Sequence, residues 1–282
     1  MRYAQIEIRL HREYNFYYFS IIYKFPIPTN VFQGIIPSMK INISKRITND
    51  RMLKTLRLLR LAGERIPSVL GKRIVREHFD LNVQSFENHR GKIAADGGFI
   101  ENQNEFTDMY YGSASVRHSG CEVIAVYNIM RALTDKEPSL PKLIAAFEKN
   151  GMIFYGSLGT DPGEMKYFLR KQGFLVEEYT RNEDFPRLLQ DSGFEGEWRL
   201  KRFHRVIPEN EAFVLTFYND RSDILQGLHT AAVTSNGRGL YLHNDGGTRA
   251  RGPYPGLSWV LNEYEHRGAG MISIIHVRSE RR

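Results

Sequence analysis

Cys121 is the only cysteine of this 282-residue chain, and it lies in the sequence Ser119-Gly120-Cys121-Glu122. Ser followed three residues later by Glu, directly before an apolar run, is the pattern of a capping box at a helix N-terminus. We therefore expect Ser119 at the N-cap and Cys121 in the first helical turn. Unpaired backbone N–H groups and the positive end of the helix dipole favour thiolate over thiol there. Cys121 is a candidate nucleophile, and the alternative is a small residue packed at a helix start.

A thiolate nucleophile needs a base, usually histidine, and the base needs an orienting acceptor. Among the nine histidines, His229 is the candidate base because it opens a predicted strand. The sequence Ser235-Asn236-Gly237-Arg238 predicts a hairpin turn after that strand. Antiparallel pairing about this turn brings Asn244 or Asp245 within reach of His229. A cysteine, a histidine and an amide or carboxylate together predict nucleophilic catalysis.

These residues resemble the papain-like cysteine peptidases, and within them the bacterial double-glycine leader peptidases and their free-standing relatives. Those proteins share a Ser/Asp-Gly-Cys helix start, a His that opens a strand and an Asn-Asp pair that closes the next strand. The matching segments, within residues 108–250, are Ser119-Gly120-Cys121, Leu228-His229-Thr230 and Leu242-His243-Asn244-Asp245. The resemblance implies a soluble, cofactor-independent hydrolase of peptides that works through an acyl-enzyme.

The resemblance also implies a role for each residue of a catalytic triad. Cys121 would be the nucleophile, His229 the general base and then the general acid, and Asp245 the residue that orients the imidazole. Strand alternation favours Asn244 instead, because Asn244 shares the face of the apolar residues before it unless a bulge intervenes. Asp245 and Asn244 are therefore both candidates for the third position.

The chain departs from the family pattern at two places. The family usually has a glutamine a few residues before the cysteine as oxyanion donor, and this chain has none between Gln103 and Cys121. Ser115 lies at about the right distance, and His118 or backbone N–H groups are substitutes. Glu122 replaces the small residue common after the cysteine, and its negative charge opposes a thiolate. The alternatives are a thiol acyltransferase, an amidase, or an inert relative that binds peptide or nucleic acid.

The order of the predicted elements favours an α+β domain, because helices come first and strands follow. The predicted helices cover residues 119–133, 139–150 and 161–172, and the first is apolar on nearly all sides. The predicted strands cover residues 174–179, 203–207, 212–218, 229–234, 239–243 and 271–277. With the resemblance, this predicts a papain-like fold in which a buried helix carrying the cysteine packs on an antiparallel sheet.

The first 95 residues differ in charge from the rest. They carry 17 Lys and Arg against 7 Asp and Glu, whereas residues 96–282 carry 22 against 25. They contain a linker rich in proline and glycine, 25–37, and a basic amphipathic helix from Thr48 or Asn49. Residues 80–108 are polar, which predicts a loop and a boundary near residue 95. We expect a basic N-terminal extension, 1–95, that meets an anionic partner or is a solvated leader, and a peptidase domain, 96–282.

Composition sets the remaining limits. Hydrophobic residues make up 41% and charged residues 25% of the chain, as in ordinary globular proteins. A single cysteine excludes an intramolecular disulfide framework and a multi-cysteine zinc site. No apolar run approaches the ~18–20 residues of a membrane span. We expect a cytoplasmic protein, with secretion as the alternative, that acts on a peptide or protein without metal or cofactor.

Overall fold

The computed structural model describes residues 6–13, 16–23, 49–64, 68–153, 156, 158–180, 207–219, 228–266 and 271–280. The chain forms two compact units, Met1–Met39 and Lys40–Arg282. In the first unit, strands β1 (Ile6–Glu13) and β2 (Phe16–Tyr23) form an antiparallel hairpin. The predicted linker 25–37 lies outside the described residues, and so does most of the predicted strand 203–207.

A six-stranded antiparallel sheet in the order β5-β10-β6-β7-β8-β9 forms the centre of the second unit. Its strands are β5 (Leu175–Tyr179), β6 (Glu211–Tyr218), β7 (Leu228–Ser235), β8 (Leu240–His243), β9 (Arg251–Tyr254) and β10 (Met271–Arg278). Five of these strands confirm predicted ones. The sequence analysis missed β9, whose Arg-Gly-Pro-Tyr sequence has the glycine and proline typical of turns. A separate short pair consists of β3 (Tyr110–Tyr111) and β4 (Ala114–Ser115).

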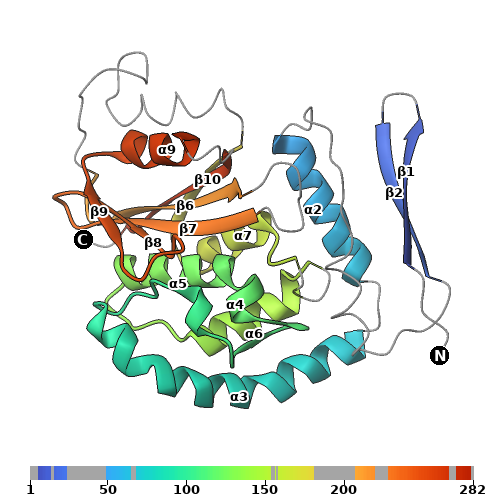
Figure 1. Ribbon diagram of the computed structural model, residues 1–282, viewed down its shortest axis with the longest axis horizontal. Helices are drawn as coiled ribbons and strands as arrows, with labels where there is room; N and C mark the ends of the chain where they lie inside the picture. Colours follow the sequence, from blue (N-terminus) through green and yellow to red (C-terminus); the bar gives the residue numbers. More distant parts are fainter. Residues whose placement is uncertain are drawn as a thin grey trace. The chain divides into compact units, whose positions relative to one another are not determined.

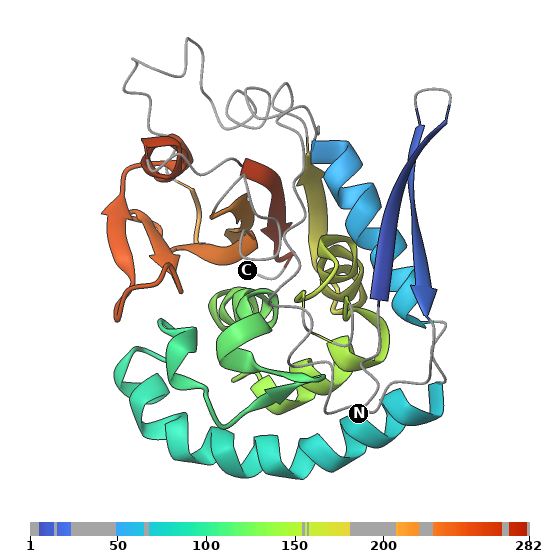
Figure 2. The ribbon, with the colours of Figure 1, turned by 45° about the vertical axis from the view of Figure 1, so that its right-hand side comes forward.

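Helices cover both faces of this sheet (Figure 1). The helices of this unit are α2 (Asn49–Glu64), α3 (Ser68–Ala95), the short 3-10 helix η3 (Gln103–Glu105), α4 (Val116–Ser119), α5 (Cys121–Leu133), α6 (Leu140–Asn150), α7 (Pro162–Lys171) and α9 (Leu257–His266). Helix α5 packs on β6 and β7, while α9 lies on the opposite face of the sheet (Figures 1 and 2). This architecture is α+β, as predicted. No helix among the described residues is long and apolar enough to cross a membrane.

Two apolar clusters on opposite faces of the sheet form most of the core. On one face, α5 is buried along nearly its whole length, as its apolar sequence predicts, and packs against Val214 and Ala232. On the other face, Leu257 and Val260 of α9 pack against a cluster that includes Val233. The helix that carries the cysteine therefore sits on one face of an antiparallel sheet.

Helix α3 shows that the loop prediction for residues 80–108 is wrong up to Ala95. Phe86 belongs to the core cluster that contains α5. Asn82 is also buried on this helix, where it donates to the Tyr110 carbonyl at 2.9 Å and accepts from the Tyr110 N–H at 2.7 Å. Because a polar asparagine occupies a buried position of the helix, the apolar repeat is interrupted and the local sequence does not predict the helix.

Helix α2 packs within the second compact unit. Its residues Met52 and Leu56 join an apolar cluster with Ile153, Tyr218 and Ile272. An ion pair of 3.6 Å links Arg60 of α2 to the buried carboxylate of Asp161, which caps α7. The unit thus begins at Lys40, upstream of the composition change near residue 95 that marks the predicted boundary.

Candidate active site

Cys121 is the first residue of α5, and Gly120 is its N-cap. The predicted capping box is wrong, because Ser119 ends the preceding helical turn, α4, and forms no cap. A Cβ atom on Gly120 would lie 2.6 Å from the Val116 carbonyl oxygen, so this close approach of the two helices requires glycine. Cys121 still occupies the first turn of its helix, as predicted.

The Cys121 thiol is buried, with 6% of the residue exposed, and its Sγ–H donates to Glu122 Oε2 at 3.2 Å. Burial and the neighbouring Glu122 carboxylate raise the pKa of the thiol well above its ordinary value. The main-chain amide of Thr230 lies against the sulfur and partly opposes this rise. The expected lowering of the thiol pKa is therefore wrong for this arrangement, because burial and the adjacent carboxylate outweigh the helix terminus. Cys121 is a neutral thiol here.

Glu122 lies in an enclosed site next to Gly159 and Thr160, which lead into α7. Its side chain is buried, and a Cβ atom on Gly159 would come within 2.7 Å of its carboxylate. Burial raises the pKa of Glu122 to about 7, although hydrogen bonds from Cys121 and the Thr160 main chain act in the other direction. Glu122 therefore changes charge near neutral pH while in contact with the sulfur.

We expect the pKa of Glu122 to make folding stability fall as the pH rises from about 5 to about 8. The folded carboxyl keeps its proton up to about pH 7, whereas the ordinary glutamate value is 4.5. The folded state thus holds more protons across this window, and it loses about 3 kcal/mol of stability through it. Urea unfolding at both ends of the window measures the loss. Glu122→Gln should remove most of it, and an unchanged pH dependence in that variant would contradict the assignment.

His229 lies at the start of β7, and its ring is held in a defined orientation. The ring contacts Phe217 edge-on at 5.4 Å between centroids, and its Nε2 lies 2.6 Å from the Asn244 carbonyl oxygen. A carbonyl oxygen only accepts, so Nε2 carries the hydrogen, and Nδ1 of the neutral ring carries the lone pair. Burial lowers the pKa of His229, while the Asn244 carbonyl and the charge of Asp245 oppose the shift. The ring is therefore neutral near pH ~7, with Nδ1 as the basic atom.

Strand β7 brings Cys121 close to the main chain next to His229. Helix α5 packs on β7, and the Cys121 sulfur lies against the main-chain amide of Thr230, the residue after His229. Strand alternation places Thr230 on the α5 face with Ala232, and places His229 on the opposite face with Val233 and beside Phe217. The thiol is hydrogen bonded to Glu122, and the imidazole is hydrogen bonded to the Asn244 carbonyl rather than to the thiol. The described site thus consists of two separate pairs, the thiol with Glu122 and the imidazole with the Asn244 carbonyl.

The two candidates for the third position differ in what they contact. Asn244 has a φ of 58°, which turns the chain out of β8, and it meets His229 through its main-chain carbonyl. The Asp245 side chain is buried and forms an ion pair of 3.2 Å with Arg251. The direct partner of the imidazole is therefore the Asn244 main chain, and Asp245 acts on the ring through its charge.

The candidate oxyanion donors lie in the segment that precedes α5. Ser115 is half-buried at the N-cap of α4, where its hydroxyl makes no cap hydrogen bond, and His118 is exposed on α4. Within the described residues, neither is hydrogen bonded to Cys121 or His229. An oxyanion role for either residue stays a prediction.

Gln103 and Glu101 are site residues that the sequence analysis missed. The Asn244 side chain accepts from the Gln103 N–H at 2.9 Å and donates to Gln103 Oε1 at 3.0 Å. Two positions earlier, Glu101 Oε1 lies 2.7 Å from Nδ1 of the buried His243. Gln103 and Asn244 are separated by 141 positions, so no local pattern predicts that they meet.

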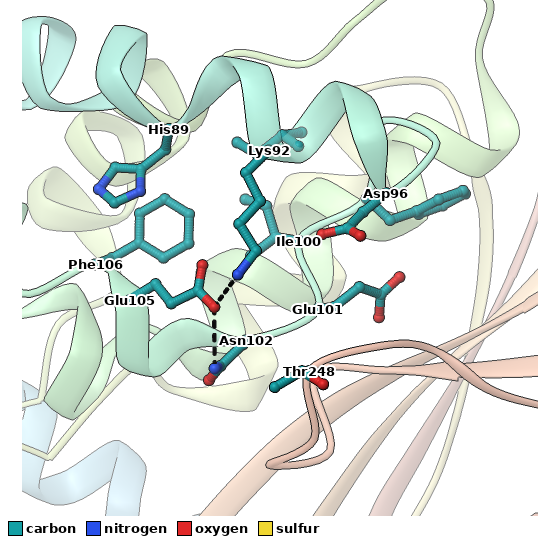
Figure 3. Close-up of a pocket in the computed structure, with 11 residues that line it drawn as sticks. His89, Lys92, Asp96, Ile100, Glu101, Asn102, Glu105, Phe106 and Thr248 are labelled. Atoms are coloured by element: carbon teal, nitrogen blue, oxygen red, sulfur yellow. Dashed lines mark hydrogen bonds and ion pairs between the residues drawn. The ribbon is translucent and has the colours of Figure 1, made fainter.

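A small pocket lies between α3, residues 99–102, Glu105, Phe106 and Thr248 (Figure 3). On its wall, Lys92 of α3 forms an ion pair with Glu105, which also accepts from Asn102 Nδ2 at 3.2 Å. The lining residues include neither the candidate nucleophile nor the candidate base. In the described part of the chain, no group of three or more His, Cys, Asp or Glu side chains is placed to hold a metal ion.

Comparisons of this chain with protein-family models, curated proteins and solved structures found no match.

Proposed function

We propose that this protein is a thiol-dependent peptide hydrolase with a papain-like arrangement, in which Cys121 is the nucleophile and His229 the base. The hydrogen bond from His229 Nε2 to the Asn244 carbonyl carries the proposal. It fixes the tautomer that leaves Nδ1 basic. Along β7, His229 directly precedes Thr230, whose main-chain amide contacts the sulfur. The order nucleophile, base and orienting residue along the chain also supports it.

The proposed reaction requires a rearrangement on substrate binding that brings the Cys121 thiol, now bonded to Glu122, and His229 Nδ1, now on the opposite face of β7, into contact. The thiol hydrogen passes to Nδ1 while Sγ forms a bond to the carbonyl carbon of the scissile peptide. His229 then gives this proton to the leaving amine as the C–N bond breaks, which leaves an acyl group on the sulfur. Water attacks the thioester, loses a proton to Nδ1 and releases the carboxylic acid, after which the thiol is restored.

The surroundings of His229 suit this proton transfer. The imidazolium formed in the first step keeps its hydrogen bond to the Asn244 carbonyl, and it is further stabilised by the negative charge of Asp245. Both interactions favour the charged ring. Burial lowers the pKa and keeps the resting ring neutral, which is the form a base requires.

Peptide cleavage by the purified full chain tests the proposal. A complex peptide mixture incubated with wild-type protein should gain new termini, and Cys121→Ala should produce none of them, because it lacks the sulfur that attacks. Lys142→Ala, on the exposed side of α6, is the control variant and should cleave as wild type does. New termini of equal abundance with Cys121→Ala, or none with wild type, would contradict the proposal.

The hydrogen bond between Cys121 and Glu122 favours a second candidate, a catalytically inert module that binds peptides. A buried thiol whose pKa is raised has little thiolate near neutral pH. Under this alternative, peptide binding persists in Cys121→Ala and no cleavage occurs with either protein. A thiol acyltransferase or amidase would share the acyl-enzyme and differ in the substrate or in the group that accepts the acyl chain.

A further inference from the structure

Gln103 connects the segment before the cysteine to the segment that holds the histidine. At the start of η3, its side-chain Nε2 donates to the carbonyl of Arg117 in α4 at 2.9 Å. Its main-chain N–H and its Oε1 pair with the side-chain amide of Asn244. We infer that Gln103 is a positioning residue that sets the orientation and tautomer of His229 through Asn244. The catalytic role of this positioning rests on the proposed function.

The contact passes from Gln103 to the imidazole through one residue. Both ends of the Asn244 side-chain amide are bound to Gln103, at 2.9 and 3.0 Å. With the side chain fixed and φ at 58°, the Asn244 main chain has one orientation, and its carbonyl accepts from His229 Nε2 at 2.6 Å. A side chain that does not touch His229 therefore determines which ring nitrogen carries the hydrogen.

The backbone around Gln103 is held by contacts that do not involve its side chain. Ile100, three residues earlier, has both main-chain groups bonded to the side chain of the fully buried Asn128, at 2.9 and 2.8 Å. Glu101 binds His243, and Glu105 pairs with Lys92 of α3 (Figure 3). Replacing the Gln103 side chain should therefore leave this segment folded.

The side chain and the main chain of Gln103 make separable contributions. Gln103→Ala keeps the N–H that binds Asn244 Oδ1, and it loses the acceptor for Asn244 Nδ2 and the donor to Arg117. Asn244 then retains one of its two amide contacts to Gln103 and can rotate. As its carbonyl moves away from Nε2, the His229 ring populates the tautomer with hydrogen on Nδ1, which cannot act as the base.

The test is a long-range proton–nitrogen NMR spectrum of the histidine rings in the full-length protein, which distinguishes the two neutral tautomers. His229→Gln identifies the His229 resonances. Wild type should show a single tautomer with hydrogen on Nε2. Gln103→Ala should shift the Nδ1 resonance toward the protonated position, as expected for a mixture. Asn104→Ala is the matched control because Asn104 is an exposed neighbour in η3, and it should give the wild-type spectrum.

Two further variants decide the outcome. Gln103→Glu keeps an acceptor for Asn244 Nδ2 and loses the donor to Arg117, so its tautomer ratio should lie between those of wild type and Gln103→Ala. Asn244→Gly removes the same amide pairing from the other side and accepts the positive φ. It should show the mixture even if Gln103→Ala does not fold.

An unshifted His229 spectrum in folded Gln103→Ala, or in Asn244→Gly when Gln103→Ala does not fold, would overturn the inference. Peptide cleavage is not part of this readout. A failed cleavage test with wild type would therefore refute the proposed function and leave the positioning by Gln103 to be judged on the spectra.

Discussion

Replacing Glu122 by glutamine should make Cys121 react at least about tenfold faster with a small alkylating reagent near pH ~8, where Glu122, with its pKa raised to about 7, is mostly ionised. Wild-type Cys121 donates its hydrogen to a buried carboxylate 3.2 Å away, and that carboxylate raises the pKa of the thiol. Glutamine has nearly the same shape without the charge, so the thiol pKa falls and the share of thiolate rises. Because Cys121 is the only cysteine, intact-mass analysis over time gives the rate directly.

Glu148→Gln is the matched control for this experiment. Glu148 is also a buried carboxylate on the same side of the sheet, but it accepts a hydrogen bond from the Gly112 N–H at 2.8 Å. Its replacement should leave the alkylation rate close to that of wild type. If Glu122→Gln reacts no faster than this control, the carboxylate does not govern the thiol and burial alone keeps Cys121 neutral.

Removing the imidazole of His229 should lower the rate of peptide cleavage by about 10²- to 10⁴-fold, the usual contribution of a general base. Wild-type activity should rise with pH through a midpoint below the ordinary histidine value of ~6.5, because burial lowers the pKa of His229 and only the neutral ring accepts a proton. The measurement is kcat/KM against pH for one peptide selected from the cleaved mixture.

Chemical rescue provides the control for His229→Ala. Free imidazole added to this variant should restore part of the lost rate if the missing group is a base, and it should have no effect on wild type. A variant that cleaves as fast as wild type, or a wild-type profile without the titration, would assign the base to another residue.

Much of the scaffold follows from local sequence patterns. The apolar run after Cys121 predicts a buried helix, and β-branched residues around the Asn-Gly turn predict the pairing of β7 with β8. These patterns depend on neighbours only a few residues apart. They also predict that His229 and the pair Asn244-Asp245 come close, because hairpin register fixes which residues face each other.

Other features depend on contacts between distant residues. The pairing of Gln103 with Asn244 arises when the segment after α3 meets the end of β8, so the sequence near either residue does not indicate it. The sign of the pKa shift at Cys121 depends on how deeply the thiol and Glu122 are buried together. A helix start in water would lower that pKa, and the sequence pattern shows the helix start without the burial.

The start of α5 shows how packing can override a capping pattern. Ser119 and Glu122 have the spacing of a capping box, yet the turn before them is also helical and Gly120 packs against Val116. Glu122 does not reach back to cap the helix, and its carboxylate receives the Cys121 thiol hydrogen instead. Glu122 therefore opposes a thiolate at Cys121, as its place in the sequence predicts, instead of capping the helix.

Trapping of the acyl-enzyme tests the central claim most directly. Wild-type protein is mixed with a peptide thioester, quenched with acid after a short interval and weighed intact, and the modified residue is located by fragmentation. The account predicts a mass increase equal to the acyl group, carried by Cys121 and absent from Cys121→Ala. A wild-type protein that gains no acyl mass between about pH 6 and about pH 9, the range in which a neutral imidazole could act as base, or that carries the acyl group on another residue, would contradict it.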